Sequence, residues 1–234
     1  IDINPELILM YTVVKEKVEK LIKKLNHMGQ DYLACDDEGR RSFFDTVRDS
    51  FNNGHGKIDF SAFGKGWIQR AAQFIFLNRT CFNGLYRVNS KGRFNVPHGR
   101  YKNPTICDAE RLRTASALLG KATLVCGSYT DSARFANAKS FIYFDPPYRP
   151  LTKSAMFTSY TKFDFDDDDQ IALGRYYAQL AKNGTLLMLS NSDPKNVRNG
   201  DSFFDELYRG FNIHRVKANR MINSDASKRG KIAE

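Results

Sequence analysis

The amino-acid sequence predicts an α/β fold, in which a parallel sheet is interrupted by a basic and turn-rich insertion. After residue 108, segments of helical and of strand periodicity alternate, and strands that alternate with helices form parallel sheets. The stretch Phe60–Cys107 differs, because it contains no Asp or Glu but eight Lys or Arg residues and nine aromatic residues. A chain of 234 residues accommodates one large domain that carries such an insertion.

The first third of the chain is expected to be mostly helical. Apolar residues recur at helical spacing over Ile3–Asn26, and Asn4-Pro5 supplies a cap followed by a favoured first helical residue. A compact apolar run, Ala71–Asn78, predicts a buried helix. Trp67 and the run Phe74–Leu77 are expected in the core rather than on a base-stacking surface.

Turn-forming residues mark the regions on either side of this buried helix. Residues 31–60 are polar and expected to be helical in part, up to a loop at 52–56. Beyond the buried helix, Asn83-Gly84 and Ser90-Lys91-Gly92 are turn formers next to short extended segments. We therefore expect a β-hairpin over residues 85–96.

The second half is expected to alternate helices and strands. In this half, the acidic run 166–169 opens the longer expected helix and Asn183-Gly184 closes it, which suits the helix dipole and a C-terminal cap. The predicted helices are Ala109–Leu119 and 166–182, and the predicted strands are Thr123–Cys126, Ser140–Phe144 and Thr185–Leu189.

Composition excludes several classes of protein. With 41% apolar residues the chain can bury a core, and no apolar run approaches the ~20 residues that span a bilayer, so a membrane protein is excluded. The formal net charge of +10 favours a polyanionic partner. Four cysteines without a C-x-x-C pair and four histidines without ligand spacing predict reduced thiols in a cytoplasmic protein, and no metal site. Because the chain opens at Ile1 without Met, we expect it to be part of a longer protein.

One short motif carries chemistry. Asp145-Pro146-Pro147-Tyr148 comes directly after an apolar strand, at the carboxyl edge where α/β sheets bind ligands. The two prolines fix the backbone and remove two N–H donors, so the loop offers a carboxylate, carbonyl acceptors and an aromatic ring together. A planar heterocycle with an exocyclic amine requires this set of groups. A proline-rich turn with an incidental Asp is the alternative interpretation.

Further sequence blocks occur in a fixed order around this motif. With them, nearly the whole chain closely resembles the Dam-type DNA adenine-N6 methyltransferases, in the order of that family's alpha group. The segments that carry the resemblance are Asp2-Ile3-Asn4, Leu77-Asn78-Arg79, 82–87, 92–102, Gly127-Ser128-Tyr129, the motif 145–148, 156–160, Leu189-Ser190-Asn191 and Ile222-Asn223-Ser224.

The resemblance implies a fold and an activity. The fold would be a Rossmann-like methyltransferase sheet in residues 1–27 and 106–234, with an inserted, mainly helical target-recognition domain at 28–105 that carries the hairpin. The activity would be methylation of adenine N6 in double-stranded DNA, with GATC as the target, in the cytoplasm at the nucleoid. S-adenosylmethionine would be the cofactor and S-adenosylhomocysteine the product. The family's glycine-rich cofactor loop would lie upstream of Asp2, outside this sequence.

The same resemblance implies that Asp145, Pro146, Pro147 and Tyr148 are the catalytic residues. Asp145 and the Pro146 carbonyl would accept hydrogen bonds from the adenine amine, and Tyr148 would stack on the extruded base. Methyl transfer would then be direct, without a covalent enzyme intermediate. The segment 157–160 would cover the emptied side of the pocket.

Cofactor-binding residues follow from the resemblance as well. Asp2 would accept hydrogen bonds from the ribose hydroxyls, because a carboxylate can bind two vicinal hydroxyls. Ser128 and Tyr129 would contact the adenine of the cofactor, and Asp145 would lie beside it.

DNA-binding residues are implied within the acid-free stretch. Arg87 would read a guanine through O6 and N7, and Leu85 would contact a thymine methyl group. The other candidates are Phe82 and Asn83 near the extruded base, Asn95 and Arg100 at phosphates, Pro97 at the backbone or a base edge, and Arg79 as a further DNA-binding residue.

Other functions stay open at this level. A DNA-binding module without catalysis would keep the basic segment and lack the cofactor loop. A methyltransferase for another planar amine, such as an RNA adenine, would more often carry Asn at the position of Asp145 and would lack the segment around Arg87. A solvated basic face is the alternative to DNA binding for the stretch 60–107. The sequence does not distinguish restriction–modification from replication and repair or from a phage role.

Overall fold

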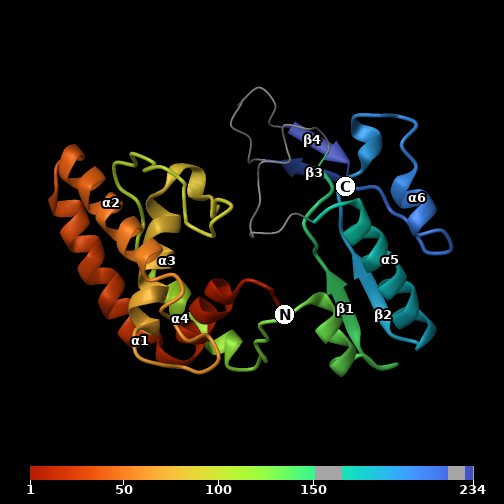
Figure 1. Ribbon diagram of the computed structural model, residues 1–234, viewed down its shortest axis with the longest axis horizontal. Helices are drawn as coiled ribbons and strands as arrows, with labels where there is room; N and C mark the ends of the chain where they lie inside the picture. The colour runs from red at the N-terminus through yellow and green to blue at the C-terminus, as the bar shows by residue number, and fades with distance from the viewer. Residues whose placement is uncertain (151–164, 221–229, 234) are drawn as a thin grey trace. The chain divides into compact units, whose positions relative to one another are not determined.

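The structure is a computed structural model that describes residues 1–150, 165–220 and 230–233. Within these ranges the chain forms two compact units, one comprising residues 1–128 and the other beginning at Tyr129. Each unit has its own apolar core. The first unit is largely helical and the second contains a small parallel sheet (Figure 1).

The first unit is built around α1, Pro5–Ala34, which packs against α3, Trp67–Thr80, and α4, Ala109–Leu119. A further helix, α2, Asp37–Asn53, packs mainly against α3. The buried helix predicted within α3 and the predicted helix α4 are both confirmed. The largest fully buried apolar side chains of this core are Leu9, Leu21, Leu25, Tyr32, Phe44, Phe76 and Leu77.

Helix α1 begins as predicted and ends later than predicted. The Oδ1 atom of Asn4 accepts the Glu6 N–H at 3.0 Å and caps the helix. The helix then continues to Ala34, beyond the predicted end at Asn26. Polar residues interrupt the apolar pattern there, but Tyr32 is fully buried, so the face that packs on the core continues for two more turns.

The predicted hairpin is present as a tight turn with a single antiparallel bridge between Val88 and Phe94, and not as two strands. The ladder stops because Pro97 has no N–H to donate, and its carbonyl accepts the Phe82 N–H at 2.9 Å instead. The side chain of Asn52, at the end of α2, bonds both backbone groups of Phe94, at 2.8 and 3.0 Å. The turn is therefore fastened to a helix end.

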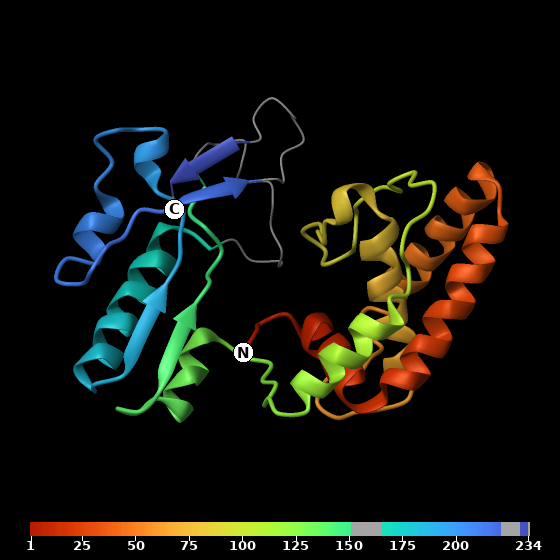
Figure 2. The same cartoon turned by 180° about the vertical axis from the view of Figure 1, so that it is seen from behind.

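The second unit confirms the predicted alternation of strand, helix and strand. Strand β1, Phe141–Phe144, pairs in parallel with β2, Leu186–Leu189, over four residue pairs. Helix α5, Asp167–Lys182, lies along this two-stranded sheet (Figure 2). The buried apolar residues of this unit's core are Phe144 of β1, three residues of α5 (Leu173, Tyr177 and Leu180) and Tyr208, which follows α6. A mixed helix and strand structure with a parallel sheet agrees with the predicted α/β class.

Shorter elements complete the described part of the second unit. They are η2, Tyr129–Phe135, η4, Pro194–Asn196, α6, Phe203–Leu207, and the antiparallel pair β3, Lys217–Arg220, and β4, Gly230–Ala233. No helix in the described ranges is both long enough and apolar enough to cross a membrane. The four cysteines are free thiols.

The strand predicted at Thr123–Cys126 is wrong as a strand. This segment makes one isolated parallel bridge, between Cys126 and Asp2. The Asp2 N–H donates to the Val125 carbonyl at 3.1 Å, and the Gly127 N–H donates to the Asp2 carbonyl at 3.0 Å. An extended segment becomes a strand only when neighbours supply a ladder, and in the described part of the chain Asp2 is the only residue that pairs with it.

Candidate active site

The parallel pairing of β1 and β2 brings two polar loops together at the carboxyl edge of the sheet. Ser190 follows β2, and its N–H donates to the Phe144 carbonyl at 3.1 Å. The Ser190 hydroxyl donates to Asp145 Oδ1 at 3.0 Å and lies 2.8 Å from the Tyr143 hydroxyl. Asp145 is exposed, and within the described ranges no hydrogen bond reaches its Oδ2 atom. Ser190 thus holds one carboxylate oxygen of Asp145, and in the described part of the chain the other keeps its capacity to accept.

The two proline carbonyls of the motif differ in their partners. The Pro147 carbonyl accepts a hydrogen bond from Gln170 Nε2 at 3.0 Å. Among the residues that the structure describes, none donates to the carbonyl of Pro146. The Pro147 carbonyl is therefore already bonded, whereas no donor in the described residues reaches the Pro146 carbonyl.

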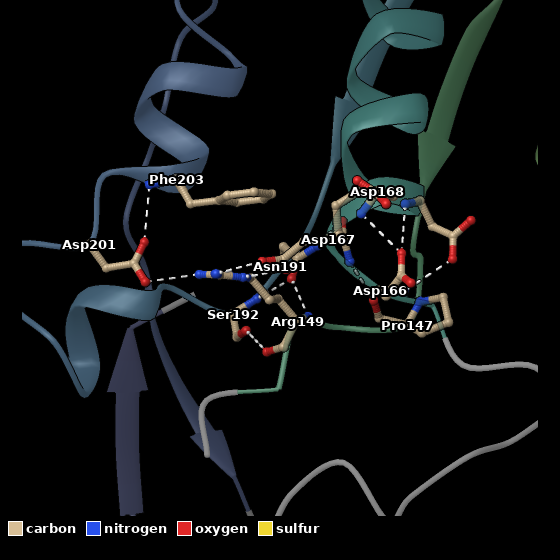
Figure 3. Close-up of polar contacts among 11 residues, drawn as sticks. Pro147, Arg149, Asp166, Asp167, Asp168, Asn191, Ser192, Asp201 and Phe203 are labelled. Carbon is tan, nitrogen blue, oxygen red and sulfur yellow. Dashed lines mark hydrogen bonds and ion pairs between the residues drawn. The ribbon is translucent and has the colours of Figure 1, made fainter. Parts of the chain in front are cut away.

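Arg149, which directly follows Tyr148 in the sequence, anchors the loop. Its guanidinium makes two hydrogen bonds to Asp167, at 2.7 and 2.9 Å, and one to Asp201 at 2.9 Å (Figure 3). It also lies over the Phe203 ring, 4.3 Å from the ring centroid. The hydrogen bonds to Asp167 contribute most to raising the pKa of Arg149. This guanidinium ties the loop to the start of α5 and to the segment before α6.

The charge of Arg149 also acts on Asp201. Burial alone would raise the pKa of this carboxyl, but the Phe203 N–H and the Arg149 guanidinium outweigh burial and hold it below its ordinary value of 3.8. Asp201 is therefore ionised near neutral pH and available to Arg149.

The acidic start of α5 forms a capping box. Asp166 Oδ1 accepts the N–H groups of Asp168 and Asp169, at 3.0 and 3.1 Å, and Asp169 Oδ2 accepts the Asp166 N–H at 3.1 Å (Figure 3). These bonds satisfy N–H groups that have no partner inside the helix. The fixed first turn places Gln170, which is fully buried, beneath the loop.

The predicted cofactor-binding residues are divided between the two units. Asp2 and Ser128 belong to the first unit, whereas Tyr129 and Asp145 belong to the second. Asp2 is half-buried, and its Oδ1 accepts the Asn4 N–H at 2.7 Å. The Tyr129 ring packs 5.5 Å from the Tyr176 ring, and burial raises its pKa.

The predicted DNA-binding residues come together in one region of the first unit. They surround the turn η1, Phe82–Gly84, which is held by the buried Cys81 and its bridge to His98. Gly99 passes so close to the Cys81 carbonyl oxygen that a Cβ atom there would lie 2.7 Å from it. Arg79, Phe82, Asn83, Asn95, Pro97 and Arg100 are exposed, and Leu85 and Arg87 are half-buried.

Two of these candidates have unusual backbone conformations. Asn83 has a φ of 55° and Arg100 a φ of 56°, and they are the only non-glycine residues with positive φ in the described ranges. Asn tolerates this region better than most residues, whereas Arg rarely adopts it. Strain of this kind is concentrated at functional sites, which favours a role for both side chains.

Arg87 is oriented by a neighbouring side chain. Its Nε donates to Asn95 Oδ1 at 3.0 Å, and the Asn95 N–H donates to the Arg87 carbonyl at 3.2 Å. No hydrogen bond within the described ranges engages the two terminal nitrogens of Arg87. Asn95 thus holds the guanidinium through Nε and leaves its two terminal nitrogens for another partner.

Arg70 must be removed from the set of basic residues that could bind DNA. It is 3% exposed, and its Nε donates to Glu6 Oε2 at 2.9 Å. It also donates to the Phe51 carbonyl and lies over the Phe51 ring. The acid-free stretch therefore presents fewer cations than its sequence suggests, because an acid outside the stretch neutralises this one. Trp67 is buried in the core, as predicted.

Some expectations fall outside the described residues, and some site residues were not anticipated. The segment 157–160 and the block Ile222-Asn223-Ser224 lie outside the described ranges. Residues whose part in this sheet edge was not predicted are Arg149, Gln170, Ser190, Asn191 and Asp201. The position of Ser190-Asn191 directly after a predicted strand was the available signal.

The fold and this edge define an α/β protein that carries a polar, acceptor-rich loop where its parallel strands end, the edge at which such sheets bind ligands. Sequence comparison makes the assignment specific. The chain belongs to the D12 class N6 adenine-specific DNA methyltransferase family, whose family model matches residues 1–222. It is therefore an adenine-specific DNA methyltransferase, and the resemblance found in the sequence is confirmed.

Three relatives illustrate the match. The chain is 50% identical over 228 residues to the Type II methyltransferase M.MjaIII of Methanocaldococcus jannaschii, covering 97% of this chain and 74% of that protein. It is 39% identical over 236 residues to the Type II methyltransferase M1.LlaDCHI of Lactococcus lactis subsp. cremoris, covering 100% and 76%. It is 32% identical over 233 residues to the DNA adenine methylase of Escherichia coli, covering 100% and 76%.

Proposed function

We propose that this enzyme transfers a methyl group from S-adenosylmethionine to N6 of an adenine extruded from duplex DNA, within GATC. The observation that carries the proposal is the pair of acceptors at the sheet edge, Asp145 Oδ2 and the Pro146 carbonyl. Neighbouring polar groups of the loop already have partners, namely Asp145 Oδ1 with Ser190 and the Pro147 carbonyl with Gln170. An exocyclic amine has two N–H groups, which match the two remaining acceptors.

These acceptors would activate the amine. The lone pair of an adenine amine is delocalised into the ring, so the nitrogen is a poor nucleophile. Two hydrogen bonds to Asp145 and the Pro146 carbonyl favour the pyramidal amine, in which the lone pair is available. N6 would take the methyl group that the sulfonium donor supplies, leaving a neutral thioether, and the proton lost from N6 would pass to solvent. Tyr148 would stack on the base, offsetting part of the few kcal/mol that extrusion costs.

The residues present fit the methyl donor. The donor supplies an electrophilic methyl group on a sulfonium. Asp2 offers a carboxylate whose Oδ2 has no hydrogen-bond partner in the described ranges, which suits a pair of ribose hydroxyls. Tyr129 sits among aromatic side chains, with the Phe165 ring at 6.5 Å, and Ser128 adjoins it in the sequence, which suits a purine ring.

The DNA-binding region supports recognition of a guanine in the target. Arg87 presents two terminal nitrogens while Asn95 holds its Nε, which is the arrangement needed for a bidentate bond to O6 and N7. The Nδ2 atom of Asn95 is left for a phosphate. Leu85 would contact a thymine methyl group and Arg100 a phosphate. Phe82 and Asn83 would lie near the extruded base, Pro97 would pack against the DNA backbone or a base edge, and Arg79 would be a further DNA contact.

We also propose a domain organisation for the chain. Residues 28–105 would form the target-recognition domain, and residues 1–27 and 106–234 would form a Rossmann-like catalytic domain. The site of action would be the cytoplasm, at the nucleoid. Relatives with Type II methyltransferase names favour a restriction–modification role, and relatives named DNA adenine methylase favour a housekeeping one.

Methyl transfer from labelled S-adenosylmethionine to duplexes with and without GATC tests the proposal, with the full-length protein. We expect N6-methyladenine in the GATC duplex alone. Asp145→Ala should abolish transfer and leave duplex binding within about threefold of the parent, because the carboxylate acts after the base is bound. The matched control is Asp49→Ala, an exposed carboxylate on α2, which should leave both unchanged.

Three outcomes would count against parts of the proposal. Equal methylation of duplexes that lack GATC would refute the target. No N6-methyladenine in any duplex would refute catalysis by this chain. Loss of both transfer and binding in Asp145→Ala would refute the assigned role of the carboxylate.

A further inference from the structure

Two amide side chains, the fully buried Gln170 and the half-buried Asn191, bond to the Asp-Pro-Pro-Tyr loop. Gln170, in the first turn of α5, is fully buried, and its Nε2 donates to the Pro147 carbonyl at 3.0 Å. Its Oε1 accepts a hydrogen bond from Asn191 Nδ2 at 3.1 Å. The two amides therefore bond to each other as well as to the loop.

Asn191, which follows β2, bonds to the same loop. Its Oδ1 accepts the Arg149 N–H at 2.9 Å and the Ser192 N–H at 2.9 Å. Ser192, which is 1% exposed, donates its hydroxyl to the Arg149 carbonyl at 2.7 Å. Figure 3 shows Asn191 and Ser192 beside Arg149, where the loop passes the end of β2.

Together these bonds enclose Tyr148. The Pro147 carbonyl belongs to the peptide group before Tyr148, and the Arg149 N–H belongs to the peptide group after it. Gln170 holds the first and Asn191 holds the second. With both flanking peptide planes fixed, the direction in which the Tyr148 Cα–Cβ bond points is fixed too, because only two soft dihedrals join the planes.

We propose that Gln170 and Asn191 are positioning residues for methyl transfer, and that their paired amides fix the direction in which the stacking Tyr148 side chain leaves the loop and keep the Pro146 carbonyl placed as an acceptor. This inference rests on the proposed function of the loop. Neither amide touches the base. They act by holding the loop in the geometry that the reacting amine needs.

The pairing is specific to amides. Gln170 must donate to one carbonyl and accept from a second amide, and Asn191 must donate to Gln170 and accept two backbone N–H groups. A carboxylate accepts only, and an aliphatic side chain does neither. Buried polar groups that lose a partner carry the full cost of desolvation, so the loop would move to satisfy them.

Single-turnover methyl transfer and duplex affinity, measured on the same variants, test the inference. Gln170→Leu keeps the volume and removes both bonds. Asn191→Asp keeps an acceptor for the Arg149 N–H, removes the donor to Gln170 and adds a negative charge beside it. The matched control is Gln73→Leu, because Gln73 is a buried glutamine of α3, 6% exposed, that bonds Ser50 in the first unit.

We expect Gln170→Leu to slow single-turnover transfer by about 100-fold, the effect of a displacement of roughly 1 Å at a reacting centre. Duplex affinity should stay within about threefold, because the DNA-binding residues lie in the first unit. Asn191→Asp should give a smaller loss of the same kind, and Gln73→Leu should leave the rate unchanged.

Gln170→Glu gives a readout that a merely structural role would not move. A neutral carboxyl can donate to the Pro147 carbonyl and accept from Asn191, as the amide does, whereas the carboxylate cannot donate. Burial and the acidic run 166–169 raise the pKa of a carboxyl placed there, and the Arg149 guanidinium lowers it. The rate of this variant relative to the parent should rise as the pH falls from about 8.5 to about 5.5.

The outcomes separate this inference from the proposed function. If the parent enzyme methylates no duplex, the proposed function fails. If the parent methylates DNA and folded Gln170→Leu does so at the parent rate, the inference is overturned. A relative rate of Gln170→Glu that does not change with pH also overturns it, and so does an equal loss in Gln73→Leu. Should Gln170→Leu unfold, Asn191→Asp and Gln170→Glu decide the matter.

Discussion

The buried ion pair between Glu6 and Arg70 yields a prediction whose size follows from its surroundings. The two side chains are 5% and 3% exposed, and the guanidinium also bonds the Phe51 carbonyl and lies 3.5 Å from the centroid of the Phe51 ring. Glu6→Gln keeps the shape of the carboxyl but leaves a cation in the interior without its counter-charge. Breaking such a pair costs about 3–5 kcal/mol in the free energy of unfolding.

The single tryptophan of the chain reports on this unit. Trp67 lies one turn before Arg70 in α3 and is 5% exposed, so its fluorescence changes when the first unit unfolds. A loss of about 4 kcal/mol, with an m-value near 2 kcal/mol/M, lowers the midpoint of urea unfolding by about 2 M. The matched control is Glu19→Gln, because Glu19 pairs with Arg113 at the surface, and this variant should not shift the midpoint measurably.

A double variant separates charge from packing. Glu6→Leu combined with Arg70→Met removes both charges and keeps apolar volume, so it should be as stable as the parent or more stable by about 1–4 kcal/mol. If Glu6→Gln unfolds at the parent's midpoint, the interior does not depend on this counter-charge and the reasoning is wrong. If the double variant loses as much as the single one, lost packing rather than an unpaired charge is the cause.

Three further outcomes are expected. Arg100→Ala should weaken binding to duplexes of every sequence and reduce the slope of log affinity against log salt by about 0.9, as loss of one phosphate contact requires; an unchanged slope contradicts that contact. Arg87→Ala should relax discrimination at one base pair by about 1–3 kcal/mol, and Asn95→Ala should do so less, because it leaves the guanidinium in place and removes the group that orients it. Competition among duplexes altered at single positions measures both, and a uniform loss across sequences would argue against base reading. Arg149→Gln should lower the unfolding temperature of the second unit near neutral pH and lose this effect in acid, because the lowered pKa of Asp201 gives stability that is present above its ordinary value of 3.8 and is lost as the pH falls through the lowered value. Circular dichroism melts at pH 7 and at about pH 2.5 compare parent and variant, and an equal difference at both would contradict the ion pair.

Local patterns accounted for much of the fold. The caps of α1 and α5 and the start of α4 follow from residues within a few positions of one another. The parallel pairing of β1 with β2 follows from the order of strand, helix and strand along the chain. The Asp-Pro-Pro-Tyr motif lies at the sheet edge because it follows directly after β1 in the sequence. The family assignment was available for the same reason, since its blocks are short and contiguous.

Long-range pairing could not be predicted. Arg70 looked like one more DNA-binding cation because its partner, Glu6, lies 64 residues away. The same limit hid Gln170, whose bond to Pro147 spans 23 residues and depends on how α5 packs against the loop. The segment 123–126 has the composition of a strand. Whether it forms one depends on its pairing partners, which its own sequence does not determine, and in the described part of the chain it makes a single bridge.

Arg100 also has a consequence for engineering. Its φ of 56° is a conformation that glycine adopts without cost, so Arg100→Gly should make the free enzyme more stable. The same change would delete the side chain proposed to contact DNA. A selection that scores folding alone would therefore favour glycine here and discard activity, whereas one that scores methylated DNA would retain arginine. The position is a place where thermostability and turnover are expected to trade against each other.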